Sequence, residues 1–341
     1  MFGVVDAVRR AQGAVLEGLG FGPSECSYRI VASGPYWKLR DYGGAVAGPC
    51  LLIIAAPIKR PYIWDLAPSL SAVRFCVDHG LRVYLLEWTS PPPGTGNAGL
   101  AEYADQAIGE AVVRIARQAG TQPFLIGHSL GGTFAAIFAA LAPQTAPGLV
   151  LLGAPLCFRP GISRFRDAIV AMAPSNLAEM EVVPGSLLSQ LSAWASPETF
   201  VWSRLLDATL SSADPAARAI HARVERWALD EVPLPGRLVH EILQWLYRED
   251  RLCQGALSIR DRIAGPSRLR IPTLAVVNPT DEIAPPASVL PFIEAMPAEH
   301  ACVLEYPGEI GIGLQHLGIL VGRQAYARLW PEIISWLKAR R

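Results

Sequence analysis

The chain has 341 residues, 51% of them hydrophobic and 18% charged, so it is long enough for a large buried core and too apolar for a disordered protein. Its 30 Lys and Arg residues balance its 30 Asp and Glu residues, which excludes the strong net charge typical of proteins that bind nucleic acid or anionic membranes. We therefore expect a globular protein with a small or neutral partner and no nucleic acid.

The cysteines and the first residues of the chain allow a prediction of the cellular compartment. The six cysteines are scattered without C-x-x-C spacing and are expected to be reduced core thiols: Cys26, Cys50, Cys76, Cys157, Cys253 and Cys302. Charges at Asp6, Arg9 and Arg10 interrupt the first apolar run, so no signal peptide is predicted. No apolar helical run reaches the roughly 20 residues that cross a bilayer. These features predict a cytoplasmic protein with no transmembrane segment.

In chain order, the first predicted element is an amphipathic helix over residues 2–19, which have apolar side chains at helical spacing and end at Gly20. Most such helices dock on their own protein, and the alternative is a role at a membrane or another hydrophobic surface. Residues 27–32 and 36–42 flank a Ser-Gly-Pro turn and predict an antiparallel hairpin.

After the hairpin, short apolar runs recur between helical segments. They lie at residues 51–55, 81–86, 124–126, 149–152, 273–277 and 302–306. This alternation is typical of a buried, mainly parallel sheet flanked by helices.

The alternation stops between residues 154 and 271, where helical stretches follow one another without a core strand. We interpret this segment as an inserted helical cap on a core formed by residues 27–153 and 272–341, with residues 1–26 as the N-terminal helix and lead-in. The cap carries four tryptophans that suit either packing on the sheet, the commoner role, or an apolar acyl pocket: Trp194, Trp202, Trp227 and Trp245.

The most informative motif is Gly127-His128-Ser129-Leu130-Gly131-Gly132. A strand-like run enters it and a helical run of small apolar residues leaves it. This context predicts a nucleophile elbow, a strained turn that thrusts its central side chain outward and tolerates little beyond glycine at its flanks. Ser129 is the candidate nucleophile.

A serine hydroxyl is protonated at neutral pH, so Ser129 would need a histidine base and an acid that orients this base. Hydrolases with such a sheet carry the acid after a late strand and the histidine after the last strand. Asp281 follows the run 273–277, and His316 follows the run 302–306. The predicted catalytic residues are therefore Ser129, Asp281 and His316.

Other acids and histidines fit this order less well. Glu282 is the rival acid beside Asp281, and Asp261 precedes its strand. His128 adjoins the nucleophile and suits a packing or pocket-wall role. The remaining histidines precede strands or lie in the cap: His79, His221, His240 and His300. No histidine pair has metal-ligand spacing, so we expect no catalytic metal and no cofactor.

Acyl transfer also requires backbone donors for the carbonyl oxygen, which becomes negative during the reaction. The same template predicts Leu130, after the nucleophile, and Ile58, in the loop after an early strand, as the oxyanion hole. The second position could shift by one residue within 57–59. Lys59 and Arg60 beside it suit either a solvated surface pair or contact with a phosphate-bearing substrate such as a coenzyme A thioester.

With these residues in place, the chain resembles poly(3-hydroxyalkanoate) synthase-type α/β-hydrolases over most of its length, especially the short synthases that act with a second subunit. The segments that carry the resemblance are WKLRDY at 37–42, PYIWDL at 61–66, VYLLEW at 83–88, residues 227–235, LYREDRL at 246–252 and DEIAP at 281–285. The resemblance implies an α/β-hydrolase fold and the roles of nucleophile, acid and base for Ser129, Asp281 and His316. It also implies a second synthase-type subunit or a homodimer as partner.

Two positions depart from that family, whose polymerising members have cysteine where this chain has Ser129 and glycine where it has Gln315. A thiolate exchanges readily with thioesters, whereas a serine ester does not, so hydrolysis or a single acyl transfer is favoured. We expect a serine hydrolase for an acyl ester or thioester, such as a hydroxyacyl oligomer or hydroxyacyl-coenzyme A. The alternatives are a synthase-type acyltransferase, and a non-catalytic partner subunit or granule-binding protein.

Overall fold

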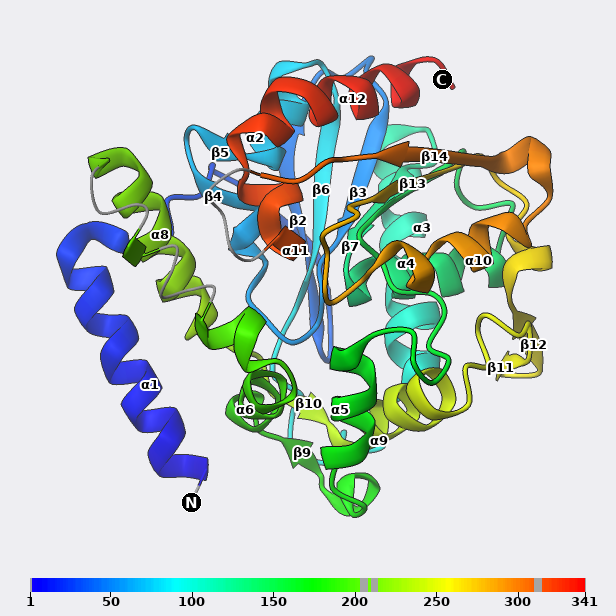
Figure 1. The fold of residues 1–341 in the computed structure, drawn as a ribbon. Helices are drawn as coiled ribbons and strands as arrows, with labels where there is room; N and C mark the ends of the chain where they lie inside the picture. Colours follow the sequence, from blue (N-terminus) through cyan, green and yellow to red (C-terminus); the bar gives the residue numbers. More distant parts are fainter. Residues whose placement is uncertain (1, 203–207, 210–213, 310–314, 341) are drawn as a thin grey trace.

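The computed structural model describes residues 2–202, 208–209, 214–309 and 315–340. Its centre is an eight-stranded sheet in the order β1-β2-β6-β3-β7-β8-β13-β14 (Figure 1). β2 pairs antiparallel with β1 and with β6, and the other neighbours are parallel. The strands are β1 (Arg29–Gly34), β2 (Trp37–Gly44), β3 (Cys50–Ile54), β6 (Arg82–Trp88), β7 (Phe124–His128), β8 (Leu149–Leu152), β13 (Thr273–Val277) and β14 (Ala301–Glu305). The predicted hairpin and mainly parallel sheet are confirmed.

Burial explains why the central strands are such continuous apolar runs. Every residue of β3, β7, β8 and β13 is buried, because helices cover both faces of the sheet. The edge strands β1 and β14 keep partly exposed side chains.

The path of the chain through the sheet places the site. From β3 the chain crosses to β6 on one side, and from β6 it crosses back past β3 to β7 on the other. Right-handed crossovers therefore put α2 (Ala72–Asp78) on one face of the sheet and α3 (Ile108–Ala119) on the opposite face. The loops after β3 and β7 leave in opposite directions, which opens a crevice at the carboxyl ends of these strands.

The remaining elements of the predicted core are helices and short strands around this sheet. They are η2 (Pro61–Trp64), β4 (Asp65–Ala67), β5 (Leu70–Ser71), η3 (Ala101–Ala107), α4 (Leu130–Leu141), η8 (Pro286–Ser288), α10 (Leu290–Glu294), η9 (Ala298–His300), α11 (Gln315–Val321), η10 (Ala325–Leu329) and α12 (Trp330–Lys338).

Between β8 and β13 the chain is mostly helical. Two short ribbons, β9–β10 and β11–β12, lie within this segment, and none of its described residues joins the main sheet. Its elements are α5 (Arg164–Met172), η4 (Leu177–Glu179), β9 (Val182–Val183), α6 (Gly185–Ala195), η5 (Glu198–Trp202), α8 (Pro215–Ala228), β10 (Leu234–Pro235), α9 (Gly236–Glu241), η6 (Ile242–Arg248), β11 (Leu257–Ile259), β12 (Arg262–Ala264) and η7 (Pro266–Arg268). The limits 154–271 of a separate cap stay a prediction.

The predicted N-terminal helix is present as α1 (Phe2–Leu16), which continues into the π-helix η1 (Glu17–Phe21) and lies beside α8 (Figure 1). The helix docks on α6 and α8, as expected, but most of its apolar stripe faces away from the protein. The exposed members of this stripe are Val4, Val8, Val15 and Leu19. The polar side is held instead, because Arg9 pairs with Glu231, and Glu17 pairs with Arg226.

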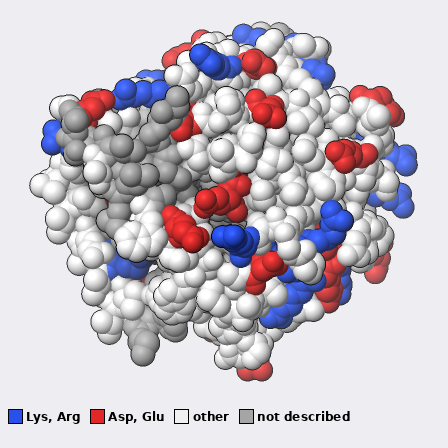
Figure 2. Space-filling model, viewed as in Figure 1, with Lys and Arg blue, Asp and Glu red and all other residues white. Residues whose placement is uncertain are grey.

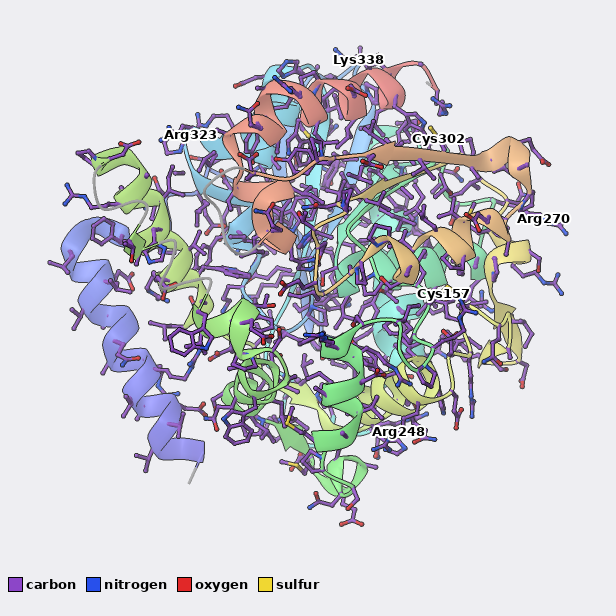
Figure 3. The ribbon with its side chains drawn as sticks, in the orientation of Figure 1. Cys157, Arg248, Arg270, Cys302, Arg323 and Lys338 are labelled. Carbon is purple, nitrogen blue, oxygen red and sulfur yellow. A yellow bond between two sulfur atoms is a disulfide. The ribbon has the colours of Figure 1, made fainter. Side chains whose placement is uncertain are left out.

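The expectation of six reduced thiols is wrong, because Cys157 and Cys253 form a disulfide. Cys157, labelled in Figure 3, follows β8, and Cys253 follows η6. The two residues are 96 positions apart in the sequence, but their Cα atoms are only 4.9 Å apart. The spacing of the cysteines in the sequence does not indicate this pairing, because the fold brings the two residues together. The free cysteines are Cys26, Cys50, Cys76 and Cys302.

Two further properties concern the surface and the membrane. Acidic and basic side chains are interspersed on the face shown in Figure 2, as the balanced composition predicts. Within the described ranges, no helix combines the length and apolar character needed to span a bilayer.

Candidate active site

The turn between β7 and α4 has the backbone of a nucleophile elbow. Ser129 has φ 55° and ψ −135°, a strained conformation for a residue with a side chain. Close backbone approaches explain its glycines: a Cβ on Gly127 would lie 2.5 Å from the Gly132 nitrogen, and one on Gly131 would lie 2.2 Å from the Ile54 oxygen. The elbow therefore holds the start of α4 directly against the end of β3.

The acid and the histidine predicted from the sequence meet beside this turn. His316 Nδ1 donates to Asp281 Oδ2 at 2.7 Å, and both side chains are buried. Asp281 Oδ1 accepts two backbone bonds, from Ile283 and Ala284, each at 2.9 Å. Burial acts to raise the pKa of Asp281, but His316 and these two N–H groups hold the pKa below its ordinary value. Asp281 is thus charged and fixed in orientation.

The rival acid Glu282 is directed elsewhere, because its carboxylate accepts a hydrogen bond from Thr199 of η5. Asp261 is exposed in the turn between β11 and β12. Neither carboxylate contacts His316 among the described residues.

His128 supports His316 from the other side. Its Nε2–H donates to the His316 carbonyl oxygen at 2.8 Å, and the two imidazole rings lie 4.5 Å apart. Burial, followed by the neighbouring His316, lowers the pKa of His128 to about 3. His128 is therefore a neutral residue of the cavity wall that supports the His316 backbone, which agrees with the packing or pocket-wall role predicted from the sequence.

The His316 nitrogen that would accept the serine proton, Nε2, is unpaired within the described residues. His316 Nε2 is buried and has no hydrogen-bond partner among the described residues, so the contact with Ser129 that general-base catalysis requires is not formed in this conformation. Such contacts often tighten only when substrate is bound. An unpaired buried nitrogen is costly, which favours a hydroxyl or water proton donor at this position.

The two predicted oxyanion donors line the same cavity as Ser129. Leu130 begins α4, where N–H groups have no intrahelical partner, and Ile58 follows β3. Within the described part of the chain, neither N–H donates to a protein oxygen. Both remain predictions for the oxyanion hole.

The cavity has a volume of about 290 Å³ and contains Ser129 and His316. Apolar side chains from the predicted core and from the helical segment between β8 and β13 form most of its wall. Among them are Ile63, Trp64, Leu130, Phe165, Phe200, Tyr247 and Ile283. Polar side chains come from α1, α6 and α8, namely Arg9, Ser189, Gln190, His221 and Glu225. The cavity therefore combines an apolar wall near the elbow with polar groups from the helices outside the sheet.

The four predicted cap tryptophans have different environments. Trp227 lines the cavity and Trp245 packs on the core, whereas Trp194 and Trp202 are 63% and 64% exposed. Lys59 and Arg60, candidates for phosphate contact, both have acidic partners in the protein: Lys59 pairs with Glu231, and Arg60 with Glu87 and Asp230.

Sequence reasoning missed two residues beside the candidate acid and base. Gly153, at φ 48° after β8, leaves room for them, because a Cβ there would lie 3.2 Å from Asp281 Oδ2 and 3.6 Å from His316 Nδ1. Gln315, noted only as a departure from the family, donates to the Glu309 oxygen at 2.8 Å and accepts from its nitrogen at 2.9 Å. The side chain of Gln315 thus anchors the backbone on which His316 lies.

Metal chemistry was not expected from the sequence. Across the described ranges, no cluster of three or more His, Cys, Asp or Glu residues is arranged to hold a metal ion.

A protein-family model described as alpha/beta hydrolase fold matches residues 64–309. The chain belongs to the α/β-hydrolase fold family. The strand order and the positions of the elbow, acid and histidine after β7, β13 and β14 agree with this membership.

The predicted resemblance to poly(3-hydroxyalkanoate) synthases is also confirmed. The poly(3-hydroxyalkanoate) polymerase subunit PhaC of Haloferax mediterranei is 28% identical over 297 residues, which cover 85% of this chain and 58% of that protein. The subunit of the same name from Synechocystis is 27% identical over 299 residues, covering 85% of this chain and 78% of that protein. This chain thus spans less than two thirds of the Haloferax protein.

Solved structures support the fold alone. A putative lipase from Sulfolobus solfataricus superposes with a TM-score of 0.58 at 18% identity, covering 92% of this chain and 93% of that one. A thioesterase domain from the curacin biosynthetic pathway gives a TM-score of 0.53 at 15% identity, covering 90% and 99%.

Proposed function

We propose that this α/β-hydrolase-fold protein is a serine hydrolase that acts on an acyl ester or thioester through an acyl-Ser129 intermediate. The observation that carries the proposal is the Asp281–His316 pair, whose histidine lines one cavity with Ser129 in its strained elbow. Each member comes from the loop that the fold uses for that role.

In the first half of the reaction, His316 Nε2 takes the proton of Ser129 while Oγ attacks the acyl carbonyl carbon. Asp281 holds the Nδ1 proton, so Nε2 is the basic nitrogen. The N–H groups of Leu130 and Ile58 stabilise the tetrahedral oxyanion. The bond to the leaving alcohol or thiol then breaks, and this group takes the proton from His316.

In the second half, a water molecule replaces the leaving group. His316 removes a proton from the water as its oxygen attacks the acyl-serine carbonyl, and the proton then returns to Ser129 Oγ as the ester bond breaks. The products are a free acid and the regenerated hydroxyl. The apolar wall near the elbow suits the acyl part of the substrate.

A second candidate is an acyltransferase that passes the acyl group from Ser129 to a hydroxyl acceptor instead of water. The names of the curated relatives, poly(3-hydroxyalkanoate) polymerase subunits, favour it. Under either reading a cytoplasmic location, and a second synthase-type subunit or a homodimer as partner, remain proposals.

The test is to incubate the protein with a fluorophosphonate and, separately, with hydroxybutyryl-coenzyme A, mapping the adduct by mass spectrometry. We expect the label on Ser129, and a loss of about 10⁴-fold or more in ester turnover for Ser129→Ala. The exposed Ser69→Ala is the matched control and should keep wild-type turnover. Free acid as product supports the hydrolase, polymer supports the acyltransferase, and retained turnover in Ser129→Ala rejects both.

A further inference from the structure

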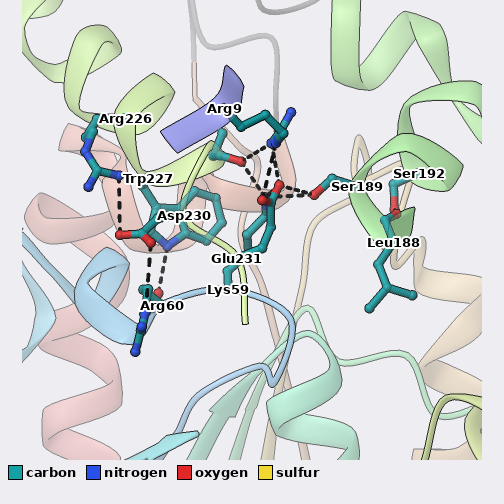
Figure 4. Close-up of polar contacts among 11 residues, drawn as sticks. Arg9, Lys59, Arg60, Leu188, Ser189, Ser192, Arg226, Trp227, Asp230 and Glu231 are labelled. Atoms are coloured by element: carbon teal, nitrogen blue, oxygen red, sulfur yellow. Dashed lines mark hydrogen bonds and ion pairs between the residues drawn. The ribbon is translucent and has the colours of Figure 1, made fainter. Parts of the chain in front are cut away.

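Glu231, outside the predicted catalytic residues, is the centre of a buried polar cluster (Figure 4). Its Oε1 accepts from Ser189 Oγ at 2.6 Å and pairs with Lys59 Nζ at 3.0 Å. Arg9 donates to both carboxylate oxygens of Glu231, through Nε at 3.3 Å and through Nη2. These three partners come from α6, from the loop after β3 and from α1, so one carboxylate joins three separate parts of the chain.

The backbone beside Glu231 pairs with the loop after β3. The Val232 N–H donates to the Ile58 oxygen at 2.9 Å, and the Arg60 N–H donates to the Asp230 oxygen at 3.2 Å. Lys59 and Glu231 are the facing residues of this two-bond bridge. The short segment 230–232 is therefore an edge partner for residues 58–60.

The indole of Trp227 adds a third bond to the same loop. Its Nε1–H donates to the Arg60 oxygen at 2.8 Å. The loop after β3 is thus held by the end of α8 and by the residues that follow this helix.

That loop is also the one next to the nucleophile. A Cβ on Gly131 would meet the Ile54 oxygen and the Ala55 carbonyl carbon, so the loop leaves β3 in contact with the elbow. Ile58, whose N–H is the second predicted oxyanion donor, lines the cavity with Ser129. Any shift of residues 58–60 would move this donor relative to the substrate carbonyl.

The carboxylate of Glu231 compensates the positive charges of Arg9 and Lys59. Its side chain is 8% exposed, and Arg9 and Lys59 beside it are 22% and 19% exposed. Burial acts to raise the pKa of Glu231, but Lys59, Ser189 and Arg9 hold the pKa below its ordinary value. Without the carboxylate, two poorly solvated cations would face each other across the loop.

The approach of α6 is equally close. A Cβ on Gly185 would lie 2.3 Å from the Glu231 Cβ, so α6 begins in direct contact with this residue. Only a residue without a side chain fits there. The helix that supplies Ser189, Gln190, Ser192 and Ala193 to the cavity wall is therefore aligned on Glu231.

We propose that Glu231 is a positioning residue of the active site: by binding Lys59, Ser189 and Arg9 it holds residues 58–60, and with them the Ile58 donor, at a fixed place relative to Ser129. The inference rests on the proposed function, because it assumes acyl chemistry at Ser129. Glu231 touches no reacting atom and acts only through this loop.

The experiment compares Glu231→Gln, which keeps the shape but loses the charge, with the exposed Glu294→Gln as matched control. kcat and KM are measured with a p-nitrophenyl ester below the thermal midpoint of each variant, together with the rate of fluorophosphonate labelling. We expect kcat and the labelling rate to fall about 10- to 100-fold for Glu231→Gln with KM changed less than about threefold, since one lost oxyanion donor costs about 10²- to 10³-fold. Glu294→Gln should match the wild type.

A second pair of variants separates positioning from general destabilisation. In an Ile58→Pro background, which lacks the N–H donor, Glu231→Gln should lower the labelling rate less than about threefold further, because the group it positions is absent. Ser189→Ala, a milder change, should lower kcat about three- to tenfold with KM unchanged. Equal losses from Glu231→Gln in both backgrounds, or an unchanged kcat in Glu231→Gln or Ser189→Ala, overturns the proposal.

These outcomes are distinct from failure of the proposed function. If Ser129→Ala keeps its turnover, the acyl-serine chemistry itself is wrong. If Ser129→Ala is inactive and Glu231→Gln is fully active, the serine hydrolase stands and the positioning role falls.

Discussion

Replacing Asp281 by asparagine tests the proposed triad most directly, because the surroundings dictate how the new side chain must lie. Asp281 Oδ1 accepts hydrogen bonds from the Ile283 and Ala284 N–H groups, and Oδ2 accepts from His316. An asparagine that keeps its oxygen toward the two backbone donors presents its NH₂ group to His316. The flipped orientation would leave two buried donors facing another donor, at about 1–3 kcal/mol each.

The favoured orientation changes the tautomer of His316. With an NH₂ group opposite Nδ1, that nitrogen must accept, so the ring proton moves to Nε2 and the basic site facing Ser129 is lost. The same tautomer change in a triad costs about 10³- to 10⁴-fold in kcat, or about 4 to 5.5 kcal/mol of transition-state stabilisation. We expect a fall of this size in Asp281→Asn, with KM changed only slightly.

The assay is steady-state turnover of a p-nitrophenyl ester together with the rate of fluorophosphonate labelling, with folding checked by thermal unfolding. Two controls use the rival acids: Glu282→Gln, whose carboxylate is bound to Thr199, and the exposed Asp261→Asn. Both should stay within about threefold of the wild type. A folded Asp281→Asn variant with more than about a tenth of wild-type kcat would refute the reasoning, as would a larger loss in Glu282→Gln.

Two other substitutions test the surroundings of the pair. Gly153→Ala adds a Cβ 3.2 Å from Asp281 Oδ2 at φ 48°, so we expect the stability to fall by about 1–2 kcal/mol and kcat to fall roughly tenfold. The control is Gly161→Ala, at φ 80° with open space around it, which should lose stability without losing kcat. Equal activities of the two variants would contradict the argument that the Gly153 contact matters. For His128, a folded-state pKa of about 3 means that the unfolded chain binds a proton below about pH 6.5 while the folded protein does not. The free energy of unfolding therefore falls by about 1.4 kcal/mol for each pH unit below this value, a loss of about 2 kcal/mol at pH 5. His128→Gln should remove this contribution, and urea unfolding at pH 7, 6 and 5 that gives parallel losses for both proteins would show that His128 is not its source.

The central strands of the sheet could be predicted because they are buried on both faces and therefore read as unbroken apolar runs. β13, Thr273–Val277, coincides with its predicted run, and every one of its residues is buried. Ser129, Asp281 and His316 could be proposed as candidates because they follow β7, β13 and the edge strand β14, and the chain order of the fold then limits the choices. The structure brings the acid and the base together within hydrogen-bond distance.

What the sequence could not supply are contacts between segments far apart in the chain. Cys157 and Cys253 pair although they are 96 positions apart, and Glu231 binds Arg9 of a helix more than two hundred positions away. The orientation of α1 could not be predicted for another reason. The periodicity of its apolar residues indicates a helix but does not indicate which side of the helix faces the protein. Arg9, bound to Glu231, settles that orientation.

The helix α4 has a consequence for attempts to change what the protein accepts. All twelve of its residues, Leu130–Leu141, are buried, and six of them are glycine or alanine. Enlarging any of these small residues would push against close-packed neighbours and shift the turn that holds Ser129. Directed evolution should therefore leave this helix intact and vary the wall supplied by α5, α6 and α8, where a new side chain alters the shape of the cavity while the backbone around Ser129 stays fixed.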